Sequence, residues 1–405
     1  MKVNLDEIKK AEITIRPYII HTLLEISESS SKIAGFEVFL KFENLQRTGS
    51  FKIRGAANKL AALTSAEKRA GVVAASAGNH AQGVACMAQK LGIKATIFMP
   101  ELSPLIKVVS TKRFGAEVVL KGSSYDEAYK NAREYQKKEG STFIHPFEDE
   151  HIIAGQGTIG LEIFADLPEV DTVFVAVGGG GLISGIGAAL KSLNPKVRVI
   201  GVQAEGADSM ARSFHSRHVE LISPTEKVST IADGIAVKQP SQTMYEDFIS
   251  KYCDDVVTIN DDEIAKTIVF LMERAKSVVE GAGAAALAGL LAHKTLIKPK
   301  KAVAVLGGGN IDLNLIERII DRGSQAAGRI AKFVVAAADV PGTLNRLTSF
   351  IAEKRANVLQ INQTRLSEKI SLKETLIEFT LETMGLDHVE IIKEGIRNLG
   401  FVIIE

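Results

Sequence analysis

A run of four glycines near the middle of the chain has the composition of an anion-binding loop. The run Gly178-Gly-Gly-Gly-Leu182 follows the apolar segment Thr172–Val177 and precedes an expected helix, Ile183–Leu190. Without side chains, the backbone can direct several N–H groups at a phosphate, and the helix adds the positive end of its dipole. A tight turn is the alternative, but four glycines exceed what a turn requires. The run also lacks the last glycine of a dinucleotide-binding G-x-G-x-x-G loop.

A lysine near the N-terminus is a candidate nucleophile. Lys52 lies in a small and mostly apolar stretch, Thr48-Gly-Ser-Phe-Lys-Ile-Arg-Gly55, at the expected start of a helix. Burial in such surroundings lowers the pKa of an amine, which makes it both a nucleophile and a base. On its own, an exposed lysine on a helix surface is the commoner explanation, because most lysines are exposed.

Three further stretches of small residues could contribute to a site. Ser76-Ala-Gly-Asn-His-Ala-Gln-Gly83 follows the apolar segment Gly71–Ala75, so that its N–H groups gather at a helix N-terminus, as a carboxylate requires. Asn79 within it offers one acceptor and two donors. The stretches Leu306-Gly-Gly-Gly-Asn310 and Thr230-Ile-Ala-Asp-Gly234 are, taken singly, typical of turns.

The elements that must position these stretches follow an α/β pattern. Short apolar segments alternate with amphipathic ones up to about Ile320, which predicts a parallel sheet covered by helices on both faces. The expected strands are Val38–Phe42, Gly71–Ala75, Ala95–Met99, Val118–Leu120, Thr172–Val177, Val197–Gln203 and Ala302–Leu306. Expected helices include Ile53–Leu63, Asn79–Leu91, Leu102–Phe114 and Tyr125–Glu139. Residues 1–320 are therefore predicted to form one α/β unit with two lobes.

A second, smaller unit is expected at the C-terminus. Residues 321–330 begin with small and polar side chains, as a linker does, and the apolar pattern restarts at Ala331. The expected strands are Ala331–Ala337, Val358–Gln363, Glu374–Leu381 and Phe401–Ile404, and the expected helices are Leu344–Lys354 and Val389–Leu399. This β-α-β-β-α-β order predicts a ferredoxin-like domain over residues 331–405.

The composition excludes several classes of protein. The 405 residues carry a formal net charge of +1, which favours neither nucleic acid nor an anionic membrane as a partner. Two isolated cysteines, Cys86 and Cys253, predict neither a disulfide framework nor a zinc site. No apolar run is long enough for a signal peptide or a membrane span, so a cytoplasmic location is expected.

Taken together and in this order, the stretches between about Ile15 and Ile320 resemble the fold-type II pyridoxal-phosphate (PLP) enzymes, most closely the threonine dehydratases (threonine ammonia-lyases). The combination of Ser-Phe-Lys-Ile-Arg-Gly, Ser-Ala-Gly-Asn-His, the glycine run and Gly-Gly-Asn is far more specific than any one piece. The resemblance implies a two-lobed, tryptophan synthase β-like catalytic domain, with a small lobe inserted at about residues 48–146.

The resemblance also implies the roles of individual residues. Lys52 would hold the cofactor covalently and later serve as the base at the substrate Cα. The cofactor ring would lie between Phe51 and Gly234, near Gly307, with its hydroxyl bonded by Asn79. The cofactor phosphate would be held by Gly178, Gly179, Gly180, Gly181 and Leu182. The substrate carboxylate would be bound by the loop of Ser76, Ala77, Gly78, Asn79 and His80.

The implied reaction is elimination of the β-hydroxyl of an amino acid. PLP withdraws electrons and acidifies the Cα–H, and the hydroxyl then leaves. Threonine would give 2-oxobutanoate, serine would give pyruvate, and both would release ammonia. The resemblance also implies isoleucine biosynthesis as the metabolic setting.

Three positions depart from related sequences. Gly307 stands where the family commonly has serine as partner of the pyridine nitrogen. Ala77 stands where serine racemases usually have a serine acid/base, which favours elimination over racemisation. Gln203 replaces a carboxylate of the divalent-metal site of those racemases, so no metal site is expected.

The C-terminal unit resembles an ACT domain, on the motif Asp339-Val-Pro-Gly-Thr-Leu344 and the later Asn357-Val-Leu359. Asp339, Val340 and Asn357 match common ligand-contact positions. ACT domains typically pair and bind a free amino acid, which implies allosteric control by isoleucine or valine and a homotetramer or dimer. A domain that only dimerises is the alternative.

Two other functions remain open at this point. A serine racemase or serine-selective lyase would share the fold, although Ala77 disfavours the racemase. A non-catalytic amino-acid sensor would share both units, but it would not need Lys52 or the glycine run. A nicotinamide dehydrogenase does not fit the register of the glycine run.

Overall fold

The computed structural model describes residues 1–223, 225–292, 298–365 and 371–404. Contacts divide the chain into two compact units, Met1–Asp312 and Leu313–Glu405. The division lies slightly before the expected end of the first domain, because the amphipathic segment Leu313–Ala326 forms helix α15 and reaches into the expected linker. Each helix in the described part of the chain is too short or too polar to span a lipid bilayer.

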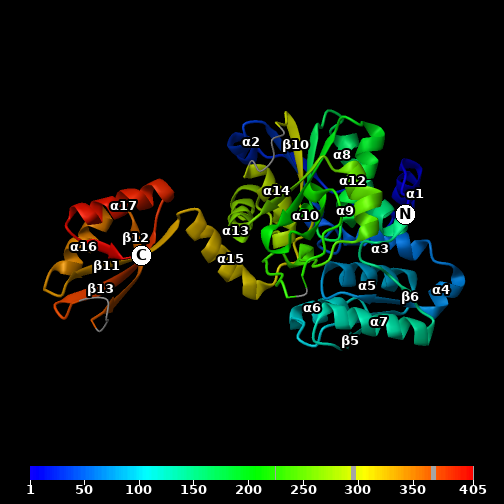
Figure 1. The fold of residues 1–405 in the computed structure, drawn as a ribbon, viewed down its shortest axis with the longest axis horizontal. Helices are drawn as coiled ribbons and strands as arrows, with labels where there is room; N and C mark the ends of the chain where they lie inside the picture. The colour runs from blue at the N-terminus through cyan, green and yellow to red at the C-terminus, as the bar shows by residue number, and fades with distance from the viewer. Residues whose placement is uncertain (224, 293–297, 366–370, 405) are drawn as a thin grey trace. The chain divides into compact units, whose positions relative to one another are not determined.

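The first unit is built on a six-stranded sheet that is parallel except at one edge (Figure 1). Its strand order is β1 (Leu24–Ile26), β2 (Glu37–Lys41), β10 (Lys301–Val305), β7 (Thr172–Ala176), β8 (Arg198–Ala204) and β9 (Asp255–Ile259). The β1–β2 pair is antiparallel and the other pairs are parallel. The predicted parallel sheet is therefore confirmed, with strand ends shifted by about one residue from those expected.

Helices cover both faces of this sheet, as adjacent residues of β8 demonstrate. A Cβ on Gly201 would contact Ile183 of α9 (Gly181–Leu193), whereas Gly289 of α14 (Gly281–Leu291) approaches Val202. Successive strand residues point to opposite faces, so α9 and α14 lie on opposite sides of the sheet, as Figure 1 also shows. Helix α8 (Glu150–Asp166) packs beside α9.

The long helix α8 was not identified from the sequence. It is buried without interruption from Ile152 to Ile163, so its sequence has no polar face and no helical period. Its glycines allow close approach of its neighbours: a Cβ on Gly155 would lie 2.6 Å from the backbone oxygen of Arg54, in α3 (Lys52–Ala61). Tight packing of α3, α8 and α9 therefore depends on residues without side chains.

A second parallel sheet forms the smaller lobe of this unit. Its order is β5 (Glu117–Leu120), β4 (Ala95–Met99), β3 (Val72–Ala75) and β6 (Thr142–Phe143). Helix α5 (Asn79–Leu91) packs on one face, where Val72 and Ala74 point, and α7 (Tyr125–Glu139) packs on the other with Val73 and Ala75. The whole sheet lies within the expected small lobe, residues 48–146.

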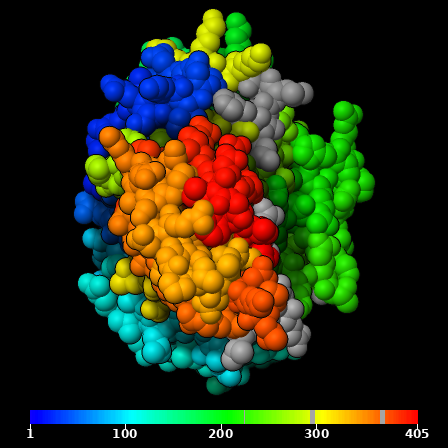
Figure 2. Space-filling view, turned by 90° about the vertical axis from the view of Figure 1, so that its left-hand side faces the viewer, coloured from blue at the N-terminus to red at the C-terminus, as the bar shows by residue number. Residues whose placement is uncertain are grey.

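The C-terminal unit has the β-α-β-β-α-β order predicted from the sequence. Its antiparallel sheet has the order β12 (Asn357–Thr364), β13 (Glu374–Glu382), β11 (Ile330–Ala338) and β14 (Val402–Ile404). This order is that of a ferredoxin-like fold. Helices α16 (Thr343–Glu353) and α17 (Leu386–Asn398) complete a core with the sheet through Ile351 and Ile392. Figure 2 shows one face of this unit, in orange and red.

A buried ion-pair network fixes the first turn of α3. Both Arg54 and Glu43 are fully buried, and Glu162 of α8 is nearly so. The guanidinium binds Glu43 at 2.7 Å and Glu162 at 2.7 Å, and Lys41 of β2 binds Glu162 at 2.7 Å. Burial opposes the charge of Arg54, but the two carboxylates reverse this and raise the pKa of its guanidinium above its usual range. Two cations thus face two buried carboxylates, and the partly exposed Asp166 lies 3.8 Å from the Lys41 amine.

Removal of Arg54 should destabilise the chain severely, because it leaves two buried carboxylates without a guanidinium. We expect Arg54→Ala to lower the free energy of unfolding by about 3–5 kcal/mol, measured by urea denaturation. Arg212 is the matched control, since it is exposed and pairs at the surface with Glu226 and with the half-buried Asp208. Arg212→Ala should cost less than about 1 kcal/mol. Equal losses in the two variants would contradict the role assigned to burial.

Candidate active site

One cavity of about 1170 Å³ in the first unit brings together segments that are far apart in the sequence. Every catalytic, cofactor and substrate residue predicted for this unit lines it: Phe51, Lys52, Ser76, Ala77, Gly78, Asn79, His80, Gly178, Gly179, Gly180, Gly181, Leu182, Gly234 and Gly307. Its wall follows the carboxyl ends of β7 and β10 in the larger lobe and of β3 in the smaller one. Ligand sites of open α/β sheets typically lie at such ends.

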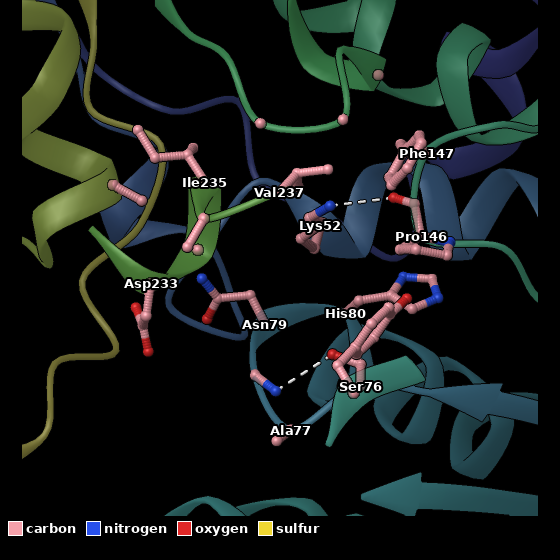
Figure 3. Close-up of a pocket in the computed structure, with 18 of the residues that line it drawn as sticks. Lys52, Ser76, Ala77, Asn79, His80, Pro146, Phe147, Asp233, Ile235 and Val237 are labelled. Atoms are coloured by element: carbon pink, nitrogen blue, oxygen red, sulfur yellow. Dashed lines mark hydrogen bonds between the residues drawn. The ribbon is translucent and has the colours of Figure 1, made fainter. Parts of the chain in front are cut away.

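Lys52 is the first residue of α3 and its amine points into this cavity (Figure 3). Its Nζ donates a hydrogen bond to the carbonyl oxygen of Pro146 at 3.0 Å and lies 5.2 Å from the Phe51 ring centre. Burial lowers the pKa of Lys52 to about 8, and the nearby Glu280 opposes that shift. The unprotonated, nucleophilic amine is therefore far more abundant at neutral pH than it is for an exposed lysine.

The glycine run forms the turn between β7 and the N-terminus of α9. Gly180 has a φ of 91°, in the region that glycine adopts without strain. A Cβ on Gly179 would lie 2.3 Å from the Phe147 ring, so the run also needs glycine for packing. Because the first N–H groups of a helix have no intrahelical acceptor, Gly181 and Leu182 can donate to an anion in the cavity.

A chain of amides and a carboxyl group borders the other side of the cavity. Asn310 donates through Nδ2 to the Thr48 carbonyl oxygen and to Asn79 Oδ1, both at 2.7 Å. Asn79 in turn donates through Nδ2 to Glu280 Oε1 at 2.6 Å. Burial, helped by the charge of Asp233, raises the pKa of Glu280 to about 7.

The loop before α5 presents backbone rather than charged side chains. Gly78 donates its N–H to Ser76 Oγ at 3.2 Å, which shapes the turn into α5 (Figure 3). His80 is buried, and its Nε2 lies 2.9 Å from the Ile144 carbonyl oxygen. Burial lowers the pKa of His80 to about 3, so the ring is neutral. The loop can accordingly accept a carboxylate without a fixed counter-charge of its own.

Sequence reasoning missed several residues of the cavity wall. Glu280, His145, Phe147 and the ion pair of Lys107 with Asp233 all lie there. The pair joins α6 (Leu105–Lys112) of the smaller lobe to the loop before Gly234. Asp233 belongs to the stretch Thr230–Gly234 that the sequence singled out, but no role was assigned to it. Glu280 also left a signal, because a single acid between Val278–Val279 and a Gly/Ala-rich helix is unusual in an apolar stretch.

The structure shows what surrounds Gly307 and Gln203, two of the positions that depart from related sequences. A Cβ on Gly307 would lie 3.5 Å from the Phe51 ring, which is ordinary contact, so no packing constraint demands a glycine there. Gln203 instead accepts hydrogen bonds from the backbone N–H groups of Met210 and Ala211, at 3.0 and 2.9 Å. Within the described ranges, no three His, Cys, Asp or Glu side chains gather as metal ligands do.

The geometry gathers a lysine amine, a glycine-rich helix N-terminus and an amide chain around one cavity, and comparisons with known proteins identify the family. Residues 15–308 match the family described as pyridoxal-phosphate dependent enzyme. The L-threonine ammonia-lyase of Thermotoga maritima is 48% identical over 98% of both chains. The chain belongs to the pyridoxal-phosphate-dependent enzymes.

Solved structures show the same fold. The processed form of threonine deaminase isoform 2 from Solanum lycopersicum matches with a TM-score of 0.74 and 36% identity, over 80% of this chain and 91% of that one. Maize serine racemase matches with a TM-score of 0.75 and 32% identity, over 80% and 99%. These matches confirm the fold class predicted for the first unit.

The residues of the cavity fit PLP, the cofactor of this family. The fit rests on three features. The Lys52 amine is desolvated, and the glycine run offers backbone N–H donors at a place where a Cβ on Gly179 would collide with Phe147. The Asn79 amide nitrogen uses one of its two hydrogens for Glu280 and has the other left for a ligand. When bound, PLP supplies an electron sink that acidifies the Cα–H of an amino acid. Lys52 would carry it, the glycine run would hold its phosphate, and Asn79 would bond its ring hydroxyl.

The glycine run can be tested by adding single methyl groups. Gly179→Ala should displace Phe147 or the loop and weaken PLP binding by at least about tenfold, because a 2.3 Å contact is not tolerated. Gly179→Ala combined with Phe147→Ala is the control, since removal of the ring makes room for the added methyl group. The affinity of the apo-protein for PLP, followed by absorbance, is the measurement. Equal affinities in both variants would contradict the packing argument.

The lowered pKa of Lys52 predicts how fast apo-protein captures PLP at different pH values. The reactive form is the neutral amine, so the rate should rise with pH and level off above about 8, the value to which burial lowers the pKa of Lys52. N-α-acetyl-lysine with the same PLP solution corrects for the cofactor's own ionisation, and its rate should keep rising toward pH 10, near the ordinary lysine pKa of about 10.4. Parallel profiles for the two amines would refute a lowered pKa.

Proposed function

We propose that this chain catalyses the PLP-dependent β-elimination of L-threonine, and of L-serine, to 2-oxobutanoate or pyruvate and ammonia. The observation that carries the proposal is the Lys52 amine, with its pKa lowered to about 8, facing a cavity lined by the glycine run and the α5 loop. The names of the similar proteins, L-threonine ammonia-lyase and threonine deaminase, support the choice of substrate.

Each group of the cavity has a distinct task in this reaction. The loop Ser76–His80 binds the substrate carboxylate through N–H groups at the start of α5. Lys52, released as a free amine, removes the Cα proton. The neutral His80 contributes no competing charge, because its pKa is lowered by burial to about 3. Proximity and orientation then supply much of the rate.

Racemisation of serine is the alternative that the similarity to maize serine racemase raises. A racemase needs a second acid/base on the face of the substrate opposite the lysine. Ala77 lines the cavity where such a group is usual in racemases, and its methyl group cannot donate a proton. Elimination, which needs no proton on that face, is therefore favoured over racemisation.

Replacement of Lys52 tests the catalytic proposal. Lys52→Ala should abolish 2-oxo acid release from L-threonine and the covalent link to PLP that borohydride reduction traps, because the amine that would form the link is gone. Lys59→Ala is the matched control: Lys59 lies on the same helix and pairs with Asp149 outside the cavity. Retained 2-oxo acid release in Lys52→Ala would rule out the assigned role, and D-serine formed from L-serine by the unaltered protein would favour the racemase.

The C-terminal unit is proposed to be an ACT domain that binds an amino acid. A hollow of about 360 Å³ is lined by Asp339 and Val340 together with Arg365, whose guanidinium binds the Asp339 carboxylate at 2.8 Å. Asn357, the third expected contact, is not part of that lining and bonds Glu382 at 3.3 Å. Asp339 is suited to an α-ammonium group, with isoleucine or valine as the proposed effector and a homotetramer or dimer as the assembly.

Substitution of Asp339 tests the regulatory proposal. Asp339→Ala should raise the isoleucine concentration needed to alter threonine turnover by about tenfold or more, because a charge-assisted hydrogen bond is lost. Asp387→Ala is the control, since Asp387 is an exposed acid of α17 that does not line the hollow. An unchanged isoleucine response in Asp339→Ala would place the effector elsewhere.

A further inference from the structure

Glu280 is a buried carboxyl group whose position is fixed by tight backbone packing. It precedes α14, and its N–H donates to the Gly308 carbonyl oxygen at 3.0 Å. Next to it, a Cβ on Gly281 would lie 2.4 Å from the Ile231 carbonyl oxygen, and one on Gly283 would lie 2.1 Å from that of Gly308. The start of α14 therefore packs closely against the backbone of both Ile231 and Gly308. Glu280 is 7% exposed.

The donors and acceptors in the hydrogen bonds around Glu280 can be assigned in only one way. The Thr48 carbonyl oxygen can only accept, so Asn310 must present its amide nitrogen there. The same nitrogen donates to Asn79, which must therefore present its oxygen to Asn310. Asn79 then turns its own nitrogen to Glu280 Oε1, at 2.6 Å. The orientation of the Asn79 amide follows from the partners at both of its ends.

One donor of Asn79 remains for a ligand. The amide nitrogen carries two hydrogens, of which Glu280 accepts one. Asn79 lines the cavity, and among the described residues its amide nitrogen donates to Glu280 alone. In Figure 3 its side chain lies between Asp233 and His80, below Lys52 and Val237. The free N–H is therefore available to the cofactor.

We propose that Glu280 is a positioning residue that holds the Asn79 amide so that its second N–H bonds the ring hydroxyl of PLP. This inference rests on the proposed function, in which Asn79 bonds that hydroxyl. Glu280 acts through Asn79 and is not itself the proton-transfer group. Without it, the amide could rotate, because Asn310 holds only its oxygen.

The role depends on the reach of the side chain more than on its charge. Burial and Asp233 raise the pKa of Glu280 to about 7, while the Asn79 hydrogen bond, Lys107 and Lys52 lower it. Both forms of the group are therefore present near neutral pH. A carboxylate and a carboxylic acid each keep an oxygen that accepts from Asn79, so the amide stays oriented in both. A glutamine at this position would keep the same acceptor.

Two substitutions separate reach from charge. Glu280→Gln keeps an acceptor oxygen at the same place and removes the charge. Glu280→Asp keeps the charge but shortens the side chain by one methylene, so that its acceptor oxygen lies farther from Asn79. The readout is the pH midpoint at which the absorption spectrum of bound PLP changes, which reports the environment of its ring hydroxyl. Asp126→Asn is the control, because Asp126 is another acid of the cavity wall and is not bonded to Asn79.

We expect Glu280→Gln and Asp126→Asn to keep the midpoint of the unaltered protein and Glu280→Asp to shift it by about one pH unit, the effect of one lost hydrogen bond. Asn79→Ala should shift it similarly, and Asn79→Ala combined with Glu280→Asp should shift it no further, because both act through one amide. Additive shifts, an unchanged midpoint in Glu280→Asp, or a shifted midpoint in Glu280→Gln would overturn the proposal.

The spectral titration is independent of the substrate. If threonine yields no 2-oxo acid but the midpoints follow the expected order, the proposed function fails and the role of Glu280 stands. If threonine turnover is rapid but Glu280→Asp leaves the midpoint unchanged, only the role of Glu280 fails. Circular dichroism of each variant is the check that the fold persists. If Glu280→Asp fails to fold, Glu280→Gln still tests the proposal, because it changes neither the size of the side chain nor its acceptor oxygen.

Discussion

The placement of the reactive amine depends on a buried salt-bridge network two residues away. Arg54 follows Lys52 in the first turn of α3, and its guanidinium joins Glu43 beside β2 to Glu162 on α8. Buried charges of this kind are costly unless each finds its partner in good geometry, so the network admits only one position of α3. The amine of Lys52 therefore enters the cavity at a fixed point, which a reaction at a single carbon atom requires.

Close helix packing extends this constraint to the glycine run. Gly155 of α8 admits the backbone of Arg54, and a Cβ on Gly185 of α9 would lie 2.4 Å from the Ile153 carbonyl oxygen of α8. The helices α3, α8 and α9 are thereby held as one tightly packed layer, in which any added methyl group would force a shift. Since α9 begins at the glycine run, the Lys52 amine and the glycine run keep a constant separation.

Burial also sets the charge of the cavity. It lowers the pKa of Lys52 to about 8, of His145 to about 4 and of His80 to about 3, and it raises that of Glu280 to about 7. Each shift favours the neutral form of the group. Backbone N–H groups at the starts of α5 and α9 add a positive potential that does not titrate and needs no reorganisation.

The sequence alone determined the class of fold and most of the site. Apolar strands followed by glycine-rich turns have a local physical signature, and these turns carry Lys52, Asn79 and the run from Gly178 to Leu182, all of which line one cavity. The ferredoxin-like order of the C-terminal unit is equally local, because it follows from alternation along each strand and the helical period between strands. Element ends differ by a few residues at most where caps are weak, as at α6.

Only the tertiary structure decided which side chains support the reactive ones. Helix α8 gave no periodic signal because all of its faces are buried. Glu280 could not be recognised from the sequence because its hydrogen-bond partner, Asn79, lies 201 positions earlier in the chain. The charge state of Lys52 was likewise undetermined by its neighbours in sequence, since the desolvation that lowers its pKa comes from the folded walls of the cavity. Local pattern specifies elements and turns, but burial and long-range hydrogen bonds exist only once the chain has folded.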